Sequence, residues 1–186
     1  DSVDLATLVL NGGGTATVTD DNALVLGATG AALSQLTVST TDDNLTQSGA
    51  VDVTGATSFA AGTGDLTLTN TNNSFGDLTV SGAAVQITED DAIDDGGAWN
   101  TTGTTTLDAG GNNILLDEAG SSTGALTLTG AAVEVDRDAA IDIAGGTVSG
   151  GLTLQSGNTI TDSGTITVTG GGLSATGDTD IDADTI

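Results

Sequence analysis

The amino-acid sequence predicts an all-β protein, a β-solenoid whose short strands wind into stacked coils with about three strands per coil. The first observation is a repeated phrase: GDLTVSGAAVQITEDDAIDD (residues 76–95) returns as GALTLTGAAVEVDRDAAIDI (residues 124–143), so that Gly82 recurs at Gly130. The second is a weaker copy at residues 13–26, in which Val18 and Leu24 match Ile87 and Ile93. Self-similarity at a regular distance is typical of solenoids and other repeat arrays.

The difference between the two repeat distances indicates the length of one coil. Three short apolar segments, near Leu36, Leu45 and Val51, are present in the first unit and absent from the second. The second unit is shorter by about 21 residues, which is a suitable length for one coil of a solenoid. A solenoid tolerates the loss of one complete coil because each coil contacts only its neighbours. Coils of about 21 to 23 residues predict roughly eight coils and a rod about 40 Å long.

Short segments with apolar residues at i and i+2 follow one another along almost the whole chain. Such a pattern predicts strands whose apolar side chains point inward while the intervening Thr, Asp, Gln or Glu points outward. Gly, Asn and Asp follow nearly every segment and suit tight corners. No segment has a helical period. The expected strands are residues 8–10, 16–18, 24–26, 36–38, 51–53, 66–68, 78–80, 85–87, 114–116, 126–128, 133–135, 141–143, 152–154 and 166–168.

An antiparallel sandwich is the competing fold, because strands this short and this closely spaced also occur there. Immunoglobulin-like domains, however, need a repeat unit of about 100 residues and a buried aromatic residue. The chain is therefore expected to be one solenoid segment, residues 1–186, with units at about 13–81, 82–129 and 130–186. An open coil end exposes unpaired backbone groups and an apolar cross-section. Each end is expected to be covered by the next coil of a longer chain or by a second copy stacked head to tail.

The charge composition excludes several classes of partner. The 186 residues include 26 acidic residues, one basic residue (Arg137) and no His, for a net charge of −25. Nucleic acid is excluded as a partner because phosphate binding requires Lys and Arg. No apolar run reaches the ~18 residues of a transmembrane helix, so no membrane insertion is expected. Cysteine is absent, which excludes disulfides and thiolate sites.

Three phrases resemble a known family of repeats: NNSFGDLTVSGAAVQIT (residues 72–88), GTTTLDAGGNNILLDEAG (103–120) and ITDSGTITVTGGG (160–172). They look like the repeats of filamentous-haemagglutinin-like large exoproteins, the adhesins of two-partner secretion and related autotransporters. The resemblance implies a right-handed parallel β-helix, secretion through an outer-membrane pore to the bacterial cell surface, and a role as an adhesive or structural stalk. It does not identify a host or surface receptor.

An enzyme on this fold would need acid–base groups that converge on one face, together with Arg, Lys or His to hold sugar acids. The chain offers only Arg137, whose equivalent in the preceding unit is Glu89. We therefore expect no catalytic residues, no cofactor and no enzymatic activity.

Calcium binding is a more plausible function than catalysis, because the chain is rich in carboxylates and hard cations bind carboxylate oxygens. The chain contains no calcium-binding nonapeptide and no complete EF-hand loop. Asp21, Asp90 and Asp138 are equivalent residues, expected in one column but three and two coils apart, too far for a shared ion. We prefer a solvated acidic surface, with a calcium-binding surface protein as an alternative. The weak calcium candidates are Glu89, Asp90, Asp91, Asp180 and Asp182.

Thr-x-Thr segments are the last feature that suggests a function, because flat threonine ladders on solenoids can bind ice. In the strands that follow the Thr-x-Thr segments, the outward positions hold Gln86, Glu134 and Asp142 in place of Thr. The high β-propensity of Thr explains why it is frequent at the other outward positions. Trp99 lies where a coil is missing and is expected to fill that corner. The sequence therefore predicts a structural, adhesive stalk segment, with an ice-binding or calcium-binding solenoid as the alternative.

Overall fold

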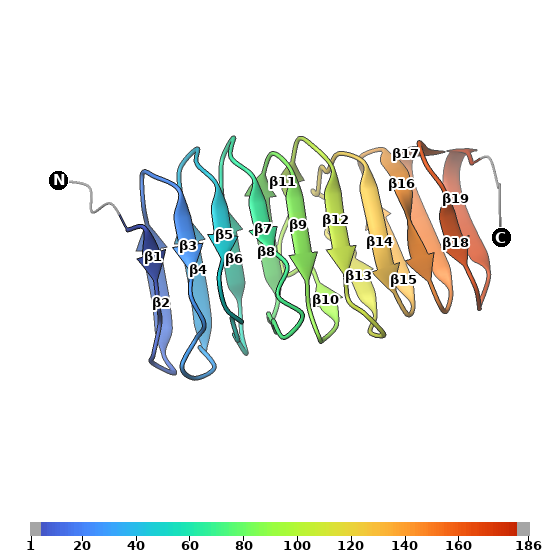
Figure 1. Cartoon of the computed structure of the whole chain (residues 1–186). Coiled ribbons are helices and arrows are strands. Elements are labelled where there is room, and N and C mark those ends of the chain that lie inside the picture. The colour runs from blue at the N-terminus through green and yellow to red at the C-terminus, as the bar shows by residue number, and fades with distance from the viewer. Residues whose placement is uncertain (1–4, 182–186) are drawn as a thin grey trace.

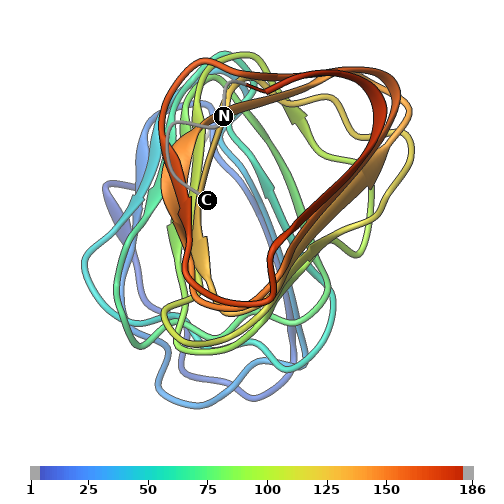
Figure 2. The ribbon, with the colours of Figure 1, turned by 90° about the vertical axis from the view of Figure 1, so that its right-hand side faces the viewer.

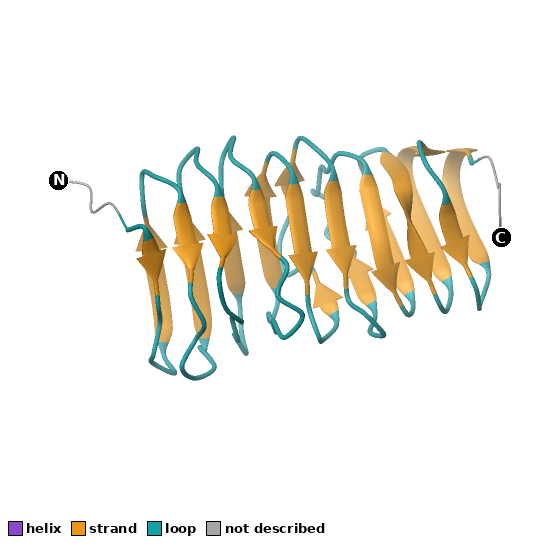
Figure 3. Cartoon of the chain, viewed as in Figure 1, coloured by secondary structure: helices purple, strands orange, loops and turns teal. Residues whose placement is uncertain are grey.

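The computed structural model describes residues 5–181 and is a parallel β-solenoid of about nine turns. Figures 1 and 3 show the turns stacked side by side, with strands and connecting loops and no helix in the described part of the chain. Seen along the stack in Figure 2, the turns are rounded triangles, so each turn has three sides. The all-β solenoid and the absence of helix are both as the sequence predicts.

Side one is the longest run of neighbouring strands and extends over the whole stack. All of its strands are parallel, and their register shifts once, between Leu126 and Thr127. It comprises β1 (Thr7–Leu8), β3 (Leu24–Leu26), β5 (Leu45–Gln47), β7 (Leu66–Leu68), β9 (Val85–Thr88), β12 (Thr105–Asp108), β14 (Leu126–Gly130), the later part of β16 (Ile141–Val148) and β18 (Ile166–Val168).

Sides two and three complete each turn. Side two comprises β2 (Thr15–Thr19), β4 (Gln35–Ser39), β6 (Thr57–Ala60), β8 (Leu78–Gly82) and β11 (Asn100–Thr101). Side three comprises β10 (Ile93–Asp94), β13 (Ile114–Leu116), β15 (Val133–Arg137), β17 (Leu152–Asp162) and β19 (Leu173–Asp180). The long strands β16, β17 and β19 pass around a corner, and residues 141–143, 160–162 and 178–180 continue side two.

The core is a column of apolar side chains inside the triangle, mostly Leu, Val and Ile with Phe59, Phe75 and Trp99. Val85, Ile87, Leu126 and Leu128 are buried as predicted, whereas Gln86 is exposed. Alternation along each strand explains this, because successive side chains point to opposite faces. One turn takes slightly fewer residues than expected, so that about nine turns rather than roughly eight fit the chain. This length follows from the registered partners on side one, which are Leu24, Leu45, Leu66, Val85, Thr105 and Leu126.

The segments missing from the second unit form one turn. Strand β4 lies on side two, β5 lies on side one, and Val53 pairs with Leu33 on side three. One strand is therefore lost from each side. The neighbouring turns can close over such a gap without a change of register, which agrees with the interpretation of the missing segment as one coil.

The repeat unit is not a whole number of turns. Two turns after Val85, the register reaches Leu126 on side one, whereas the repeat equivalent of Val85 is Val133, which lies on side three. Likewise, three turns after Val18 the register reaches Val80 on side two, whereas the equivalent residue is Ile87 on side one. Each unit therefore begins one side, or a third of a turn, further around the triangle.

This rotation corrects one sequence-based expectation. Asp21, Asp90 and Asp138 follow β2, β9 and β15, which lie on sides two, one and three, so the three aspartates do not share a column. The expectation was wrong because it treated each unit as a whole number of coils. A third of a turn is permitted because all three sides accept the same alternating pattern of small apolar and polar residues.

Two positions show why the corners need glycine. A Cβ on Gly76 would overlap the carbonyl oxygen of Gly55 in the turn below, and a Cβ on Gly124 would overlap that of Gly103. Both pairs are repeat equivalents, although they lie at different corners. Glycine is required there because consecutive turns approach too closely for a side chain.

Trp99 fills the corner beside the missing coil, as expected. It is buried, its indole Nε1–H donates to the carbonyl oxygen of Leu78 at 2.8 Å, and its backbone N–H donates to Ser121 Oγ at 3.0 Å. A buried indole needs such a partner for its single donor. The residue thus joins three successive turns, and its buried side chain is unavailable to a ligand.

Candidate functional site

Three repeat-equivalent corner residues, Asp20, Glu89 and Arg137, carry ionisable side chains into the core. Each continues the alternation of the preceding strand by one more inward position, and each is only 1–3% exposed. Because the units rotate, these residues occupy three different corners. The same slot thus holds a short acid, a long acid and a base, and burial makes the ionic state of each one costly.

Asp20 is fully satisfied by backbone donors. Its Oδ2 accepts the N–H of Leu5 at 2.9 Å, and its Oδ1 accepts the N–H of Asn22 at 3.1 Å. A carboxylate that accepts backbone N–H groups at a turn compensates for the loss of hydration. This corner is a structural turn rather than a reactive site.

Glu89 is less well satisfied. Its Oε2 accepts the N–H of Phe75 at 2.9 Å, whereas its Oε1 has no hydrogen-bond partner among the described residues. Burial raises the pKa of Glu89 to about 8, the nearby negative charges of Asp91 and Asp90 also raise it, and the hydrogen bond from Phe75 lowers it. Glu89 is therefore mostly protonated at neutral pH, since a neutral acid is cheaper to bury than a carboxylate.

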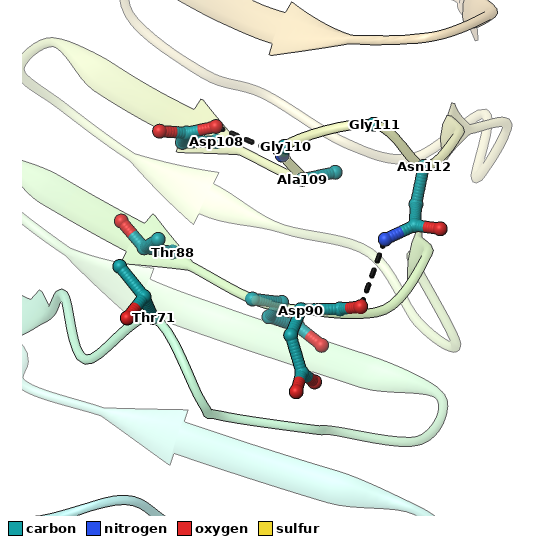
Figure 4. A pocket seen from close by; sticks show the side chains of 9 residues that line it. Thr71, Thr88, Asp90, Asp108, Ala109, Gly110, Gly111 and Asn112 are labelled. Atoms are coloured by element: carbon teal, nitrogen blue, oxygen red, sulfur yellow. Dashed lines mark hydrogen bonds between the residues drawn. The ribbon is translucent and has the colours of Figure 1, made fainter.

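Glu89 also lines a pocket of about 310 Å³ at the corner after β9 (Figure 4). The lining comes from three successive turns: Thr71, residues 88–90 and residues 108–112. Asn112 Nδ2–H donates to the Asp90 carbonyl oxygen at 2.8 Å, and the Gly110 N–H donates to Asp108 Oδ1 at 2.9 Å. The bond from Asn112 holds the loop of one turn over the loop below, and the bond from Gly110 fixes the conformation of its own loop. Asp90 and Asp108 belong to different turns, and their carboxylates are not brought together with that of Glu89.

Arg137 and Asp95 form a second buried ionic arrangement. Arg137 Nη1–H donates to Thr123 Oγ1 at 2.6 Å, while its Nε and Nη2 lack hydrogen-bond partners in the described part of the chain. Burial lowers the pKa of Arg137, and the negative charge of Asp95 opposes that shift. Asp95 is 3% exposed and accepts the N–H of Asp117 at 2.8 Å and that of Glu118 at 3.3 Å.

Asp94, Asp95 and Asp117 form the group of carboxylates that lies closest together among residues 5–181. Their oxygen atoms lie within 4.8 Å of one another. Burial raises the pKa of Asp95 to about 6, with a further rise from the charge of Asp117 and lowering by its two backbone hydrogen bonds and by Arg137. Burial and the charges of Asp77 and Asp117 raise the pKa of Asp94. Three oxygens are fewer than the six to eight that calcium takes, and both oxygens of Asp95 already accept backbone N–H groups.

Among the described residues, the sequence-based calcium candidates do not form a group of three converging carboxylates. Glu89 points into the core, whereas Asp90 and Asp91 are exposed. Asp180 is exposed at the end of β19, and Asp182 lies outside the described residues. The sequence-based prediction grouped Glu89 with Asp90 and Asp91 on the outer surface, and for Glu89 this was wrong. The alternation that starts at Ile87 indicated an inward side chain for Glu89.

The acidic group at Asp95 was also missed, although the repeat contained a signal for it. Asp95 occupies the position of Ile143 in the following unit and of Leu26 in the preceding one, both of which are buried apolar residues. A charged residue in an apolar slot is informative, because it must find partners inside the protein. The proximity of Asp117, one turn away, is decided by the stacking register.

Threonine columns are the third feature with binding potential. On side one, Thr46 pairs with Thr67, and Thr106 pairs with Thr127, with Gln86 between the two pairs in the same column. A second column on the same side contains Thr88, Asp108, Thr129, Thr147 and Thr167. We call these eight threonines the threonine face. The expected interruption by Gln86 is present, but Glu134 and Asp142 lie on other sides.

No helix in the described part of the chain is long and apolar enough to cross a membrane.

The comparisons with known proteins identify a repeat family. A family model described as repeats of unknown function (DUF5649) matches residues 13–81, 74–129 and 130–185. No curated protein and no solved structure matches the chain. The three matched stretches together cover most of the 186 residues. The chain therefore belongs to the DUF5649 family of repeats.

Proposed function

We propose that this chain is a non-catalytic structural and adhesive stalk segment of a secreted bacterial surface adhesin. The observation that carries the proposal is the continuous stack of registered parallel strands on side one, from β1 to β18. Each turn buries its apolar residues against the turns on both sides, so a solenoid works as a stiff spacer whose length follows from the number of turns. Secretion and location at the cell surface follow from the resemblance to filamentous-haemagglutinin-like exoproteins.

The rotation of the units supports a spacer over an array that repeats one binding site from unit to unit. Equivalent residues, such as those of β8 and β14, face different directions, so no side repeats the same residues from unit to unit. A binding array for an extended ligand would need units of a whole number of turns. A spacer has no such requirement, because only the alternation of inward and outward residues matters.

The environment of Arg137 supports a non-catalytic role. Arg137 is the single basic residue and is 2% exposed, so it cannot bind a sugar acid at the surface. An acid–base pair working on a glycan would also need an accessible partner of suitable pKa. Glu89 has a raised pKa, but its side chain is only 3% exposed. In this proposal the partners are the next turns of a longer chain, or a second copy stacked head to tail, and a surface receptor.

The experiment that tests the proposal removes one registered turn from the chain displayed on bacterial cells. Leu45 and Leu66 are registered neighbours on side one, so deletion of residues 45–65 joins equivalent points of two turns. We expect the shortened chain to remain folded and the cells to retain their adhesion. Deletion of residues 45–54 alone is the matched control, because it breaks the register and should unfold the segment. Loss of adhesion from a folded, displayed chain that lacks residues 45–65 would instead place a specific site in that turn.

Ice binding is the rival function, and the threonine face is the observation that favours it. Its columns are interrupted in the middle of the stack by Gln86 and Asp108, which disrupts a lattice of identical hydroxyl and methyl groups. Thermal hysteresis of the purified chain would decide in favour of ice binding and against the stalk.

A further inference from the structure

The threonine face differs from the rest of the outer surface in its charge. Within the strands of side one, with β16 counted from Gly145 onward, Asp108 is the single acidic residue in the described part of the chain. Side three carries Asp94, Glu134 and Asp136 in its strands, and the later part of side two carries Asp142, Asp162, Asp178 and Asp180. In a protein with a net charge of −25, the strands of this side are thus nearly uncharged throughout the described part of the stack.

We propose that the threonine face binds the same face of a second copy of this chain, so that two solenoids associate side by side. Like charges placed opposite each other across an interface cost free energy and suppress the wrong pairings. Two acidic rods repel at every side that carries carboxylates, and the repulsion is least where the threonine faces meet. A basic partner would gain nothing on this side and would bind the acidic sides instead.

The size and chemistry of the face fit a reversible dimer. Nine strands about 4.8 Å apart, each two to five residues wide, give a face of roughly 40 by 11 Å, or on the order of 900 Å² for both partners. That area is at the lower end for specific interfaces and predicts association that depends on concentration. Threonine suits such a contact because its β-branched side chain has few rotamers to lose. Its methyl group can pack while its hydroxyl donates or accepts a hydrogen bond.

Side two provides an internal comparison. The strands β2, β4, β6, β8 and β11 are also uncharged, with Thr17 paired to Thr37 and Ser58 paired to Thr79. This uncharged area ends where Asp142 and Asp162 continue side two. It spans about half the stack, so its contact area falls below what a specific interface needs. Side one is therefore the side that we assign to the second copy.

The test measures the mass of the 186-residue chain by sedimentation over a wide concentration range. Thr106 lies near the middle of side one, and Thr153 is an exposed residue on side three. Thr106→Asp places a new charge in the interface twice, once from each copy, and should weaken the dimer at least about tenfold. Thr153→Asp gives the same net charge and should leave the dimer unchanged. Conversely, Asp108→Asn should tighten the dimer, whereas Asp136→Asn on side three should not.

A second measurement separates side-by-side from head-to-tail association. The chain has no cysteine, so Thr106→Cys introduces a single thiol. A short thiol-to-thiol cross-linker should then join two copies, and Thr153→Cys should give no product. Unchanged melting temperatures show that the variants remain folded. A parent chain that stays monomeric at every concentration overturns the proposal, as does equal weakening by Thr106→Asp and Thr153→Asp. A monomer that shows thermal hysteresis overturns it in favour of ice binding.

Discussion

The two copies of the repeated phrase, residues 76–95 and 124–143, have the same local structure in different surroundings. Strands β8 and β14 have the same burial pattern, and β9 and β15 both alternate from a buried first residue. Yet the first copy occupies sides two, one and three in turn, while the second occupies sides one, three and two. Local sequence therefore decides strand and direction of side chains, whereas the number of residues before each copy decides its side.

The inward slots are where the copies differ. The first copy has Glu89 and Asp95, whereas the second has Arg137 and Ile143 at the equivalent positions. The negative charge of Asp95 in the first copy opposes the lowering of the pKa of Arg137 in the second. The comparison shows that a shared pattern of burial tolerates side chains of opposite charge type at equivalent inward positions.

The largest expected effect tests whether the copies bury equivalent residues equally. Leu78→Asp and Leu126→Asp each place an unpaired charge in the core, and each should lower the free energy of unfolding by about 5 kcal/mol. Both leucines are fully buried. Urea unfolding followed by circular dichroism measures the change. Thr79→Asp and Thr127→Asp are the outward controls and should cost less than about 1 kcal/mol. A Leu126→Asp protein as stable as the parent would show that the register is wrong.

The next effect concerns the charge pair that spans the two copies. Asp95→Ile gives the first copy the residue of the second and leaves Arg137 buried without its acid, so it should cost about 3 kcal/mol. The double variant Asp95→Ile with Arg137→Met removes both charges and should recover most of that loss. A double-mutant cycle from urea unfolding gives the coupling. Additive costs would mean that the two side chains do not interact.

A smaller effect distinguishes the copies by pH. The folded-state pKa of Glu89 is about 8, above its unfolded value, so its contribution to stability is present at acid pH and is lost as pH rises towards 8. Asp95, with a pKa of about 6, acts in the same direction but completes its loss at lower pH. Between pH 6 and 8 the free energy of unfolding should therefore fall by about 2 to 3 kcal/mol.

Glu89→Gln tests the origin of that pH dependence, because glutamine keeps the shape and the acceptor for the Phe75 N–H without titrating. Its free energy of unfolding should be nearly flat between pH 6 and 8, when measured by thermal unfolding at several pH values. Asp138→Asn, at an exposed position of the second copy, should retain the slope of the parent. An unchanged slope in Glu89→Gln would assign the titration to another group.

The smallest effect concerns salt. Screening of the net charge of −25 should raise the melting temperature slightly with NaCl, and CaCl₂ at matched ionic strength should give the same rise if the acidic groups are only solvated. Asp94→Asn or Asp117→Asn should not alter that equality. A rise at micromolar calcium that disappears in these variants would instead establish a site at Asp94, Asp95 and Asp117.

Much of the fold was predictable from the sequence because each strand has its own alternating pattern of apolar and polar residues. Leu126-Thr127-Leu128 alternates apolar and polar residues, and such a pattern can bury only one face. The corner glycines and the segment missing from the second unit further indicated a solenoid with coils of that segment's length. The candidate sites were harder to predict from the sequence. Asp95 and Asp117 are far apart in the chain, and only the stacking register brings their carboxylates together.

By itself, the sequence determined most strands, most inward and outward residues, and the approximate length of one turn, since these depend on contacts within a few residues or on the immediate repeat. The tertiary structure alone decided which side of the triangle each strand occupies. Each unit is longer than a whole number of turns by one third of a turn, and this excess rotates every later unit. No single strand shows this excess. That accumulated rotation separates Asp21, Asp90 and Asp138. The stacking of successive turns brings Thr46, Thr67, Thr106 and Thr127 onto one side.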